Sequence, residues 1–151
     1  MRPLFLCFFL GDADQLQIDP VQENITGTIG QSRDARIKEL HRIINDLESE
    51  NPDNQPTKSR KGQLAAHTGD RETALQMYEW LESADQPFLL GTNKRRQAMI
   101  AAALGEKSRA VTLLQDAFRN GRPYSIDYHR YHVFFPLHGF PEFEEFMKPK
   151  G

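Results

Sequence analysis

Residues 64–75 read LAAHTGDRETAL, and residues 100–111 read IAAALGEKSRAV. When the two segments are aligned, Gly69 matches Gly105 and Ala74 matches Ala110, both at a separation of 36 residues. Each segment contains the small-residue end of one helix, a turn of Gly and an acidic residue, and the start of a second helix. A fixed period of this size is typical of helical repeat proteins. The pattern therefore predicts an all-α fold of α-α hairpin repeats.

Two such repeats are expected over residues 57–122. The first helix of the first repeat starts at Thr57, and the Gly69 turn leads into the second helix. The breaker Asp85-Gln86-Pro87 separates the repeats, and Pro87 is suited to the first position of the next helix. This third helix is expected to run through Gly91 to Leu104, although an interior glycine costs about 1 kcal/mol. The fourth helix should end at residues 121–123, which read GRP.

An amphipathic helix is expected before the repeats, over residues 32–50. Ser32 is a suitable N-cap, and Asp34 places negative charge in the first turn. Asn51-Pro52 ends the helix. Apolar side chains recur at spacings of three and four along it, which predicts one buried stripe: Ile37, Leu40, Ile43, Ile44 and Leu47.

Residues 1–31 combine an apolar start with an irregular polar segment. The run Leu4–Leu10 follows Met1-Arg2, and we interpret it as a core-packing segment or as the cut edge of a longer ancestral protein. The alternative is that residues 1–13 are a short secretory signal, which would make the chain a periplasmic or secreted protein. Seven apolar residues are too few to span a bilayer as a helix. Cys7 is the single cysteine, so an intramolecular disulfide and a cysteine-based zinc site are excluded.

Aromatic residues dominate residues 123–151. A repeat array needs an atypical end to cover its last apolar face, and the aromatic rings predict such a C-terminal cap. Pro141 is expected to start a short terminal helix with acidic residues in its first turn. The rings are Tyr124, Tyr128, Tyr131, Phe134, Phe135, Phe140, Phe143 and Phe146.

Composition and charge give no support for nucleic-acid binding. The 151-residue chain has a net charge of −2, whereas nucleic-acid-binding domains usually present a clearly basic surface. Two basic clusters, at residues 58–61 and 94–96, are balanced by acidic residues elsewhere. We interpret them as solvated helix faces.

No catalytic or cofactor site is expected. The chain lacks a phosphate-binding glycine loop, a Gly-x-Ser-x-Gly elbow and a His-Glu-x-x-His motif. His129, His132 and His138 form the one histidine cluster, but their aromatic surroundings favour packing over metal binding. Acidic groups such as Glu142, Glu144 and Glu145 are expected to be solvated. The sequence therefore predicts a chain that is not an enzyme and holds neither metal nor cofactor.

The repeats resemble the tetratricopeptide repeat family. That family has small residues in its first helix, a Gly-acid turn, and an alanine followed by a large residue in its second helix. Its usual period is about 34 residues, and neither repeat here has the family's Trp. Residues 57–151 also look like the C-terminal tail of large bacterial regulatory proteins of this family. The positions that match the repeat consensus are Gly62, Ala65, Gly69-Asp70, Ala74 and Tyr78, then Ala98, Ala101, Gly105-Glu106, Ala110 and Leu114. The resemblance to the tail rests on residues 101–106 and 110–114, His129-Arg130, Phe135-x-Leu137, Pro141-x-Phe143 and residues 148–151.

The resemblance implies a right-handed solenoid that binds a protein or peptide partner in a concave groove lined by the first helix of each repeat. The groove residues would be Ser59, Gln63, His67, Arg95 and Met99. The Lys and Asn pair that clamps a peptide carboxylate in some members is replaced by Ser59 and Gln63. The expected function is a regulatory or scaffolding interaction module in the cytoplasm. Two repeats bury little core, so the apolar run Leu4–Leu10 needs a cover. A homodimer joined through the N-terminal segment is expected, and the alternative is that the run folds back onto the helix of residues 32–50.

Overall fold

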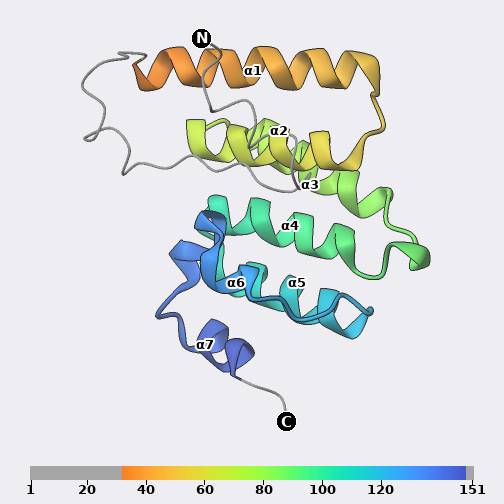
Figure 1. Cartoon of the computed structure of the whole chain (residues 1–151), viewed down its shortest axis with the longest axis vertical. Coiled ribbons are helices and arrows are strands. Elements are labelled where there is room, and N and C mark those ends of the chain that lie inside the picture. The colour runs from red at the N-terminus through yellow and green to blue at the C-terminus, as the bar shows by residue number, and fades with distance from the viewer. Residues whose placement is uncertain (1–31, 149–151) are drawn as a thin grey trace.

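The computed structural model describes residues 32–148, and over this range the chain is helical without a strand (Figure 1). Figure 1 shows the helices stacked along the longest axis, with α1 at one end and α7 at the other. The predictions of a signal segment, a packed Cys7 and an N-terminal dimer contact fall outside the described residues. The elements are α1 (Arg33–Glu50), α2 (Gln55–Thr68), α3 (Arg71–Ser83), η3 (Pro87–Leu89), α4 (Thr92–Ala103), α5 (Lys107–Arg119), α6 (Asp127–Arg130), η4 (His132–Leu137) and α7 (Pro141–Met147).

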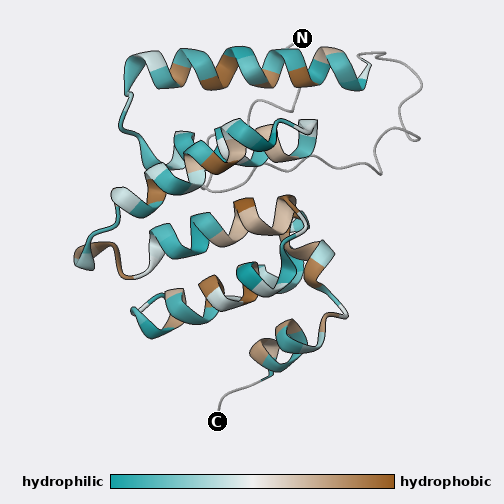
Figure 2. Ribbon diagram, turned by 180° about the vertical axis from the view of Figure 1, so that it is seen from behind, coloured by the Kyte–Doolittle hydropathy of each residue, from teal (hydrophilic) through white to brown (hydrophobic). Residues whose placement is uncertain are grey.

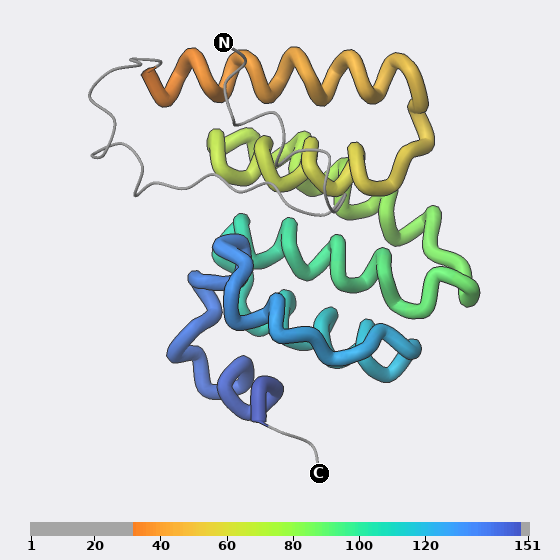
Figure 3. The backbone as a smooth tube through the Cα atoms, in the orientation of Figure 1, coloured from red at the N-terminus to blue at the C-terminus, as the bar shows by residue number. Residues whose placement is uncertain are grey.

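Helix α1 begins and ends as its sequence predicts. The Ala35 amide donates a hydrogen bond to the Ser32 hydroxyl at 3.3 Å, and Asn51 is the C-cap. Ile44 is buried, while the other members of the apolar stripe are half-buried. Short connections make α1 and α2 antiparallel, as the tube in Figure 3 shows. The start of α1 therefore lies beside the end of α2.

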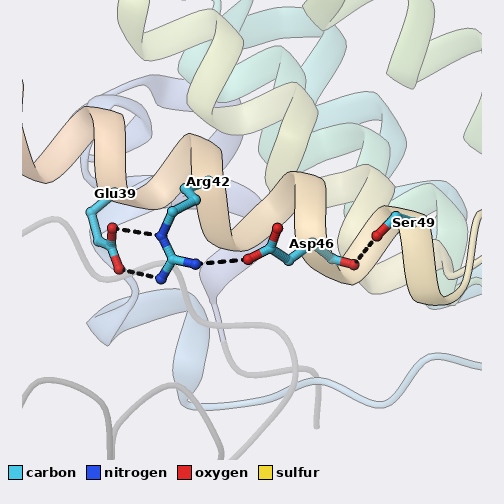
Figure 4. A network of polar contacts seen from close by, with 4 residues as sticks. All are labelled: Glu39, Arg42, Asp46 and Ser49. Atoms are coloured by element: carbon cyan, nitrogen blue, oxygen red, sulfur yellow. Dashed lines mark hydrogen bonds and ion pairs between the residues drawn. The ribbon is translucent and has the colours of Figure 1, made fainter.

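The outer side of α1 carries a chain of polar contacts (Figure 4). Arg42 donates to both Glu39 oxygens at 2.6 and 2.9 Å and to Asp46 at 2.8 Å. The hydrogen bond from Arg42 lowers the pKa of Glu39 below its ordinary value. These groups are exposed, and such pairs within one helix contribute little to stability. The Figure 4 contacts therefore mark a solvated face rather than a site.

Helix α2 starts two residues earlier than the sequence analysis places it. Asn54 is the N-cap, and its side-chain oxygen accepts a hydrogen bond from the Thr57 amide at 2.9 Å. Pro56 fits in the first turn, where a backbone N–H has no helical partner. The side-chain cap thus leaves only a short connection between α1 and α2.

The 36-residue repeat is present in the backbone. Gly69 and Gly105 both have left-handed conformations, with φ of 86° and 79°. The amide of Asp70 donates to the Ala65 carbonyl, and the amide of Glu106 donates to the Ala101 carbonyl, each at 2.9 Å. Both helices thus end in the same glycine-centred cap, which reverses the chain. The pairs α2–α3 and α4–α5 are the result.

Small residues let these helices pack closely. Ala74, Ala98 and Ala110 are fully buried. Gly62 lies where α2 meets α4: a β-carbon there would come within 2.5 Å of Ile100 and 2.9 Å of Met77. Figure 2 shows that the end of α4 is mainly apolar and its start mainly polar.

The expected third helix is interrupted, which corrects the prediction that Gly91 lies inside a helix. A short 3₁₀ turn, η3, is followed by Leu90 and Gly91 in left-handed conformations, and α4 starts at Thr92. The cause is a close contact with α5, because a β-carbon on Gly91 would lie 2.3 Å from the Ala117 carbonyl oxygen. Gly91 is therefore the N-cap of α4.

Polar contacts join the second helices of the two repeats. The Arg109 guanidinium lies 4.1 Å from the centre of the Tyr78 ring, a cation–π arrangement. Glu106 accepts hydrogen bonds from Arg109 at 3.0 Å and from Arg71 at 2.5 Å. Because Arg71 and Tyr78 belong to α3, these contacts fix α5 against the preceding repeat.

The C-terminal aromatic residues pack on one another and extend the core. Tyr128 contacts Phe134 and Phe146 edge to face, with ring centres 5.5 and 5.6 Å apart. Element η4 packs on α4, and α7 packs on α5. Two of the rings, Tyr124 and Phe135, remain exposed.

We predict that Ala74→Leu and Ala110→Leu each lower the free energy of unfolding by about 1–3 kcal/mol, because both positions are fully buried. Glu72→Leu is the control, since Glu72 is exposed on α3. Urea unfolding followed by circular dichroism measures the difference. Equal stability of all three variants would contradict the close packing described above.

We predict that Gly91→Ala destabilises the chain more than Gly69→Ala does. Both glycines have positive φ, which costs a side-chain-bearing residue about 1–2 kcal/mol. Only Gly91 faces a backbone contact as well, and overpacking adds about 1–3 kcal/mol. Thermal unfolding of the two variants checks the ranking, and equal losses would argue against the contact with Ala117.

Candidate protein-interaction surface

Four of the five predicted groove residues are buried. Ser59 and Gln63 on α2 are each 3% exposed, and Arg95 and Met99 on α4 are each 2% exposed. The Gln63 amide donates a hydrogen bond to the Ser59 hydroxyl at 3.0 Å. His67, near the end of α2, is exposed. Four residues thus lie on the facing first helices, but they do not form an open surface.

Two residues that the sequence analysis did not select belong to the same surface. Arg60 and Arg96 are 7% and 8% exposed, and they occupy equivalent positions 36 residues apart. The expectation that the basic clusters are solvated is therefore wrong for these two residues and for Arg95. Arg60 and Arg96 could have been identified from the sequence, because their separation equals the repeat period of 36 residues. We name this set the basic face: Ser59, Arg60, Gln63, Arg95, Arg96 and Met99.

Polar contacts connect the two helices that carry the basic face. Arg96 donates a hydrogen bond to the side-chain oxygen of Gln55 at 3.1 Å and another to that of Asn93 at 3.0 Å. Gln55 belongs to α2, so Arg96 reaches across from α4 to the neighbouring helix. The Asn93 side chain in turn donates to the Leu81 carbonyl at 3.2 Å. These contacts orient α4 between α2 and α3.

The C-terminal segment covers one part of the basic face. The Arg95 guanidinium lies 5.2 Å from the centre of the Tyr131 ring. Burial is the main cause that raises the pKa of the neighbouring Tyr128 hydroxyl, and the positive charge of Arg95 opposes this rise. The chain therefore uses its own aromatic residues to enclose Arg95.

Charge is unevenly distributed among the helices. Helix α2 contains Lys58, Arg60 and Lys61 and no acidic residue. Helix α4 contains Lys94, Arg95 and Arg96, again with no acidic residue. The first helix of each repeat is thus purely basic, so anionic partners for it must come from other parts of the chain or from other molecules.

Glu48 of α1 provides one such partner. Its carboxylate oxygens lie 2.5 Å from Lys58 Nζ and 2.6 Å from Lys61 Nζ. Burial alone raises the pKa of Glu48, but the hydrogen bonds and charges of the two lysines outweigh it, and the pKa lies below its ordinary value. Glu48 therefore joins α1 to α2 beside the basic face.

The histidine cluster does not form a ligand set. His129 is in α6 and lies 3.1 Å from the Tyr124 hydroxyl, whereas His132 is in η4 and contacts the Phe135 ring. The His138 ring stacks on Phe143. Across residues 32–148, no group of three or more His, Cys, Asp or Glu side chains is placed to hold a metal ion. Within the same range, no helix has the length and apolar character needed to cross a membrane.

The chain was compared with protein-family models, curated proteins and solved structures, and none of them matches it.

We predict that Glu48→Gln destabilises the chain by up to about 1 kcal/mol at pH 7 and by less at pH 3. Folding lowers the pKa of Glu48. The ionised carboxylate therefore adds to the free energy of unfolding at pH values above its unfolded-state pKa of about 4.3. This contribution is lost as the pH falls through the folded-state pKa. Urea unfolding between pH 3 and 7 measures it. The control is Glu50→Gln, at an exposed position of the same helix. A difference that persists unchanged at pH 3 would contradict the ionic role.

Proposed function

We propose that this chain is a non-catalytic protein–protein interaction module of the tetratricopeptide-repeat type, with a regulatory or scaffolding role. The observation that carries the proposal is the basic face, where Arg60 and Arg96 repeat at equivalent positions of two adjacent first helices. A repeated cationic position on facing helices suits a linear partner that runs across both repeats.

The chemistry of the basic face favours an acidic protein segment as partner. The arginine guanidinium is planar and presents several N–H donors, which match a carboxylate with two parallel hydrogen bonds. Gln63 adds a donor and an acceptor, and Met99 adds an adaptable apolar contact. The net charge of −2 disfavours a polyanion such as nucleic acid.

Burial of the basic face adds a condition to this proposal. Arg60, Arg95 and Arg96 are all at most 8% exposed. A partner must therefore displace whatever part of the chain covers the face. Only a partner that binds the basic face more favourably than the groups that now bury it would bind such a module.

We predict that the proposed partner is captured by the intact chain and is lost from the Arg60→Gln/Arg96→Gln variant. Affinity purification with mass spectrometry compares the two, and circular dichroism shows whether the variant is folded. The control variant, Lys107→Gln/Arg119→Gln, removes two exposed charges from α5, outside the basic face.

The proposal requires a protein that the intact chain and the control variant retain and that the Arg60→Gln/Arg96→Gln variant does not. If the folded variant captures the same proteins as the intact chain, the basic face is not the binding site.

A further inference from the structure

We propose that a second copy of this chain docks on three exposed apolar side chains where η3 meets the end of α5, so that the protein forms a symmetric homodimer. We name this set the apolar patch: Phe88, Leu90 and Phe118. The inference goes beyond the proposed function, because it concerns a surface other than the basic face and holds whether or not that face binds a partner.

The apolar patch is open to solvent and joins two parts of the chain. Phe88, Leu90 and Phe118 are 77%, 56% and 45% exposed. A β-carbon on Gly121 would lie 3.5 Å from Leu90 Cδ2, and the Gly121 amide donates to the Phe118 carbonyl at 3.0 Å. The connection between α3 and α4, which Figure 2 shows with a hydrophobic stretch, therefore lies against the end of α5.

The conformation of Leu90 is unfavourable for an isolated chain. Its φ of 48° is the one positive φ outside glycine among residues 32–148. A β-carbon disfavours this left-handed conformation, which asparagine tolerates better than leucine. Because the Leu90 side chain is also exposed, the fold of one chain gains little from its burial. Backbone strain of this kind is concentrated where a protein binds a ligand or switches its conformation.

The apolar patch has the size of an interface core. Three such side chains at these exposures leave on the order of 300 Å² of apolar surface in contact with solvent. Stable interfaces bury about 800 Å² on each partner, with an apolar core inside a polar rim. The apolar patch would therefore supply the core, and the polar residues beside it would supply the rim.

The charges beside the apolar patch favour a second copy over a partner of one charge sign. In a twofold interface each patch meets itself, so a rim of one sign would repel its equivalent. Two ion pairs inside the chain flank the patch, Lys94 with Glu82 at 3.8 Å and Arg119 with Asp116 at 2.8 Å. Residues 82–94 and 116–122 together hold three acidic and three basic residues: Glu82, Asp85, Asp116, Lys94, Arg119 and Arg122. The rim is thus neutral and compatible with a copy of itself.

The dependence of molecular mass on concentration tests the dimer in the full chain. Light scattering and sedimentation should show an equilibrium between monomer and dimer. Phe88→Asp places two like charges at the twofold contact and should raise the dissociation constant about tenfold or more. An intact chain that is monomeric at every concentration would overturn the inference. A folded Phe88→Asp variant that dimerises as the intact chain does would overturn it as well.

Phe135→Asp is the matched control. It introduces the same charge at an aromatic residue that is 46% exposed but lies in η4, against the His132 ring and outside the apolar patch. This variant should dimerise as the intact chain does. An equal loss of dimer in both variants would show a general effect of added negative charge and would overturn the inference.

Leu90→Asn separates docking from the stability of one chain, and it keeps the test decisive if Phe88→Asp fails to fold. Asparagine accepts the left-handed conformation and removes the apolar side chain. We expect the variant to unfold at a higher temperature than the intact chain under dilute, monomeric conditions, yet to dimerise more weakly. Unchanged dimerisation would mean that Leu90 serves only the fold of one chain, and it would overturn the inference.

Spin labelling locates the contact. A nitroxide is attached to the Cys7→Ser/Ser83→Cys variant, since Ser83 is exposed at the end of α3, and the labelled chain is mixed with unlabelled ¹⁵N chain. Paramagnetic broadening of the ¹⁵N copy is expected at residues 86–91 and 116–121. Broadening confined to α1 or to residues 1–31 would place the dimer contact at the N-terminal part of the chain and would overturn the inference.

Discussion

The close approach of α2 to α4 is the constraint on which the rest of the structure depends. Gly62 has no room for a β-carbon beside Ile100 and Met77, so a larger residue would push the two first helices apart. The fully buried Ala74, Ala98 and Ala110 keep the same small size at the neighbouring helix contacts. Since α2 and α4 are in contact, Arg96 can reach Gln55, and equivalent residues of the two repeats lie on adjacent helices.

This packing concentrates positive charge instead of dispersing it. Both first helices are purely basic, and their arginines are buried rather than solvated. A fold that needed only stability could place apolar residues there, because a buried ionic pair is seldom more stable than well-packed hydrophobic residues. The retained arginines support the recognition role that we propose for the basic face. In contrast, the Arg42 contacts on α1 are exposed and have the character of ordinary surface pairs.

Local signals predicted much of the fold. The Ser32 cap, the two Gly-acid turns and the start of α7 at Pro141 each depend on a few neighbouring residues, and the structure has all of them. Features set by distant contacts were missed. The sequence predicts a helix through Gly91 because it does not show that the Ala117 backbone lies against this residue. It predicts solvated basic clusters for the same reason, since burial depends on what packs over a helix.

For the candidate surface too, the sequence predicts which helix carries a residue but not whether that residue is buried. The resemblance to the tetratricopeptide repeat family selected Ser59, Gln63, Arg95 and Met99, but only the structure shows that they are buried and accompanied by Arg60 and Arg96. If the basic face binds a partner, as we propose, the groups that now bury its arginines must first move away. The free energy of that exchange, together with the affinity of the exposed face, would then set which partners bind.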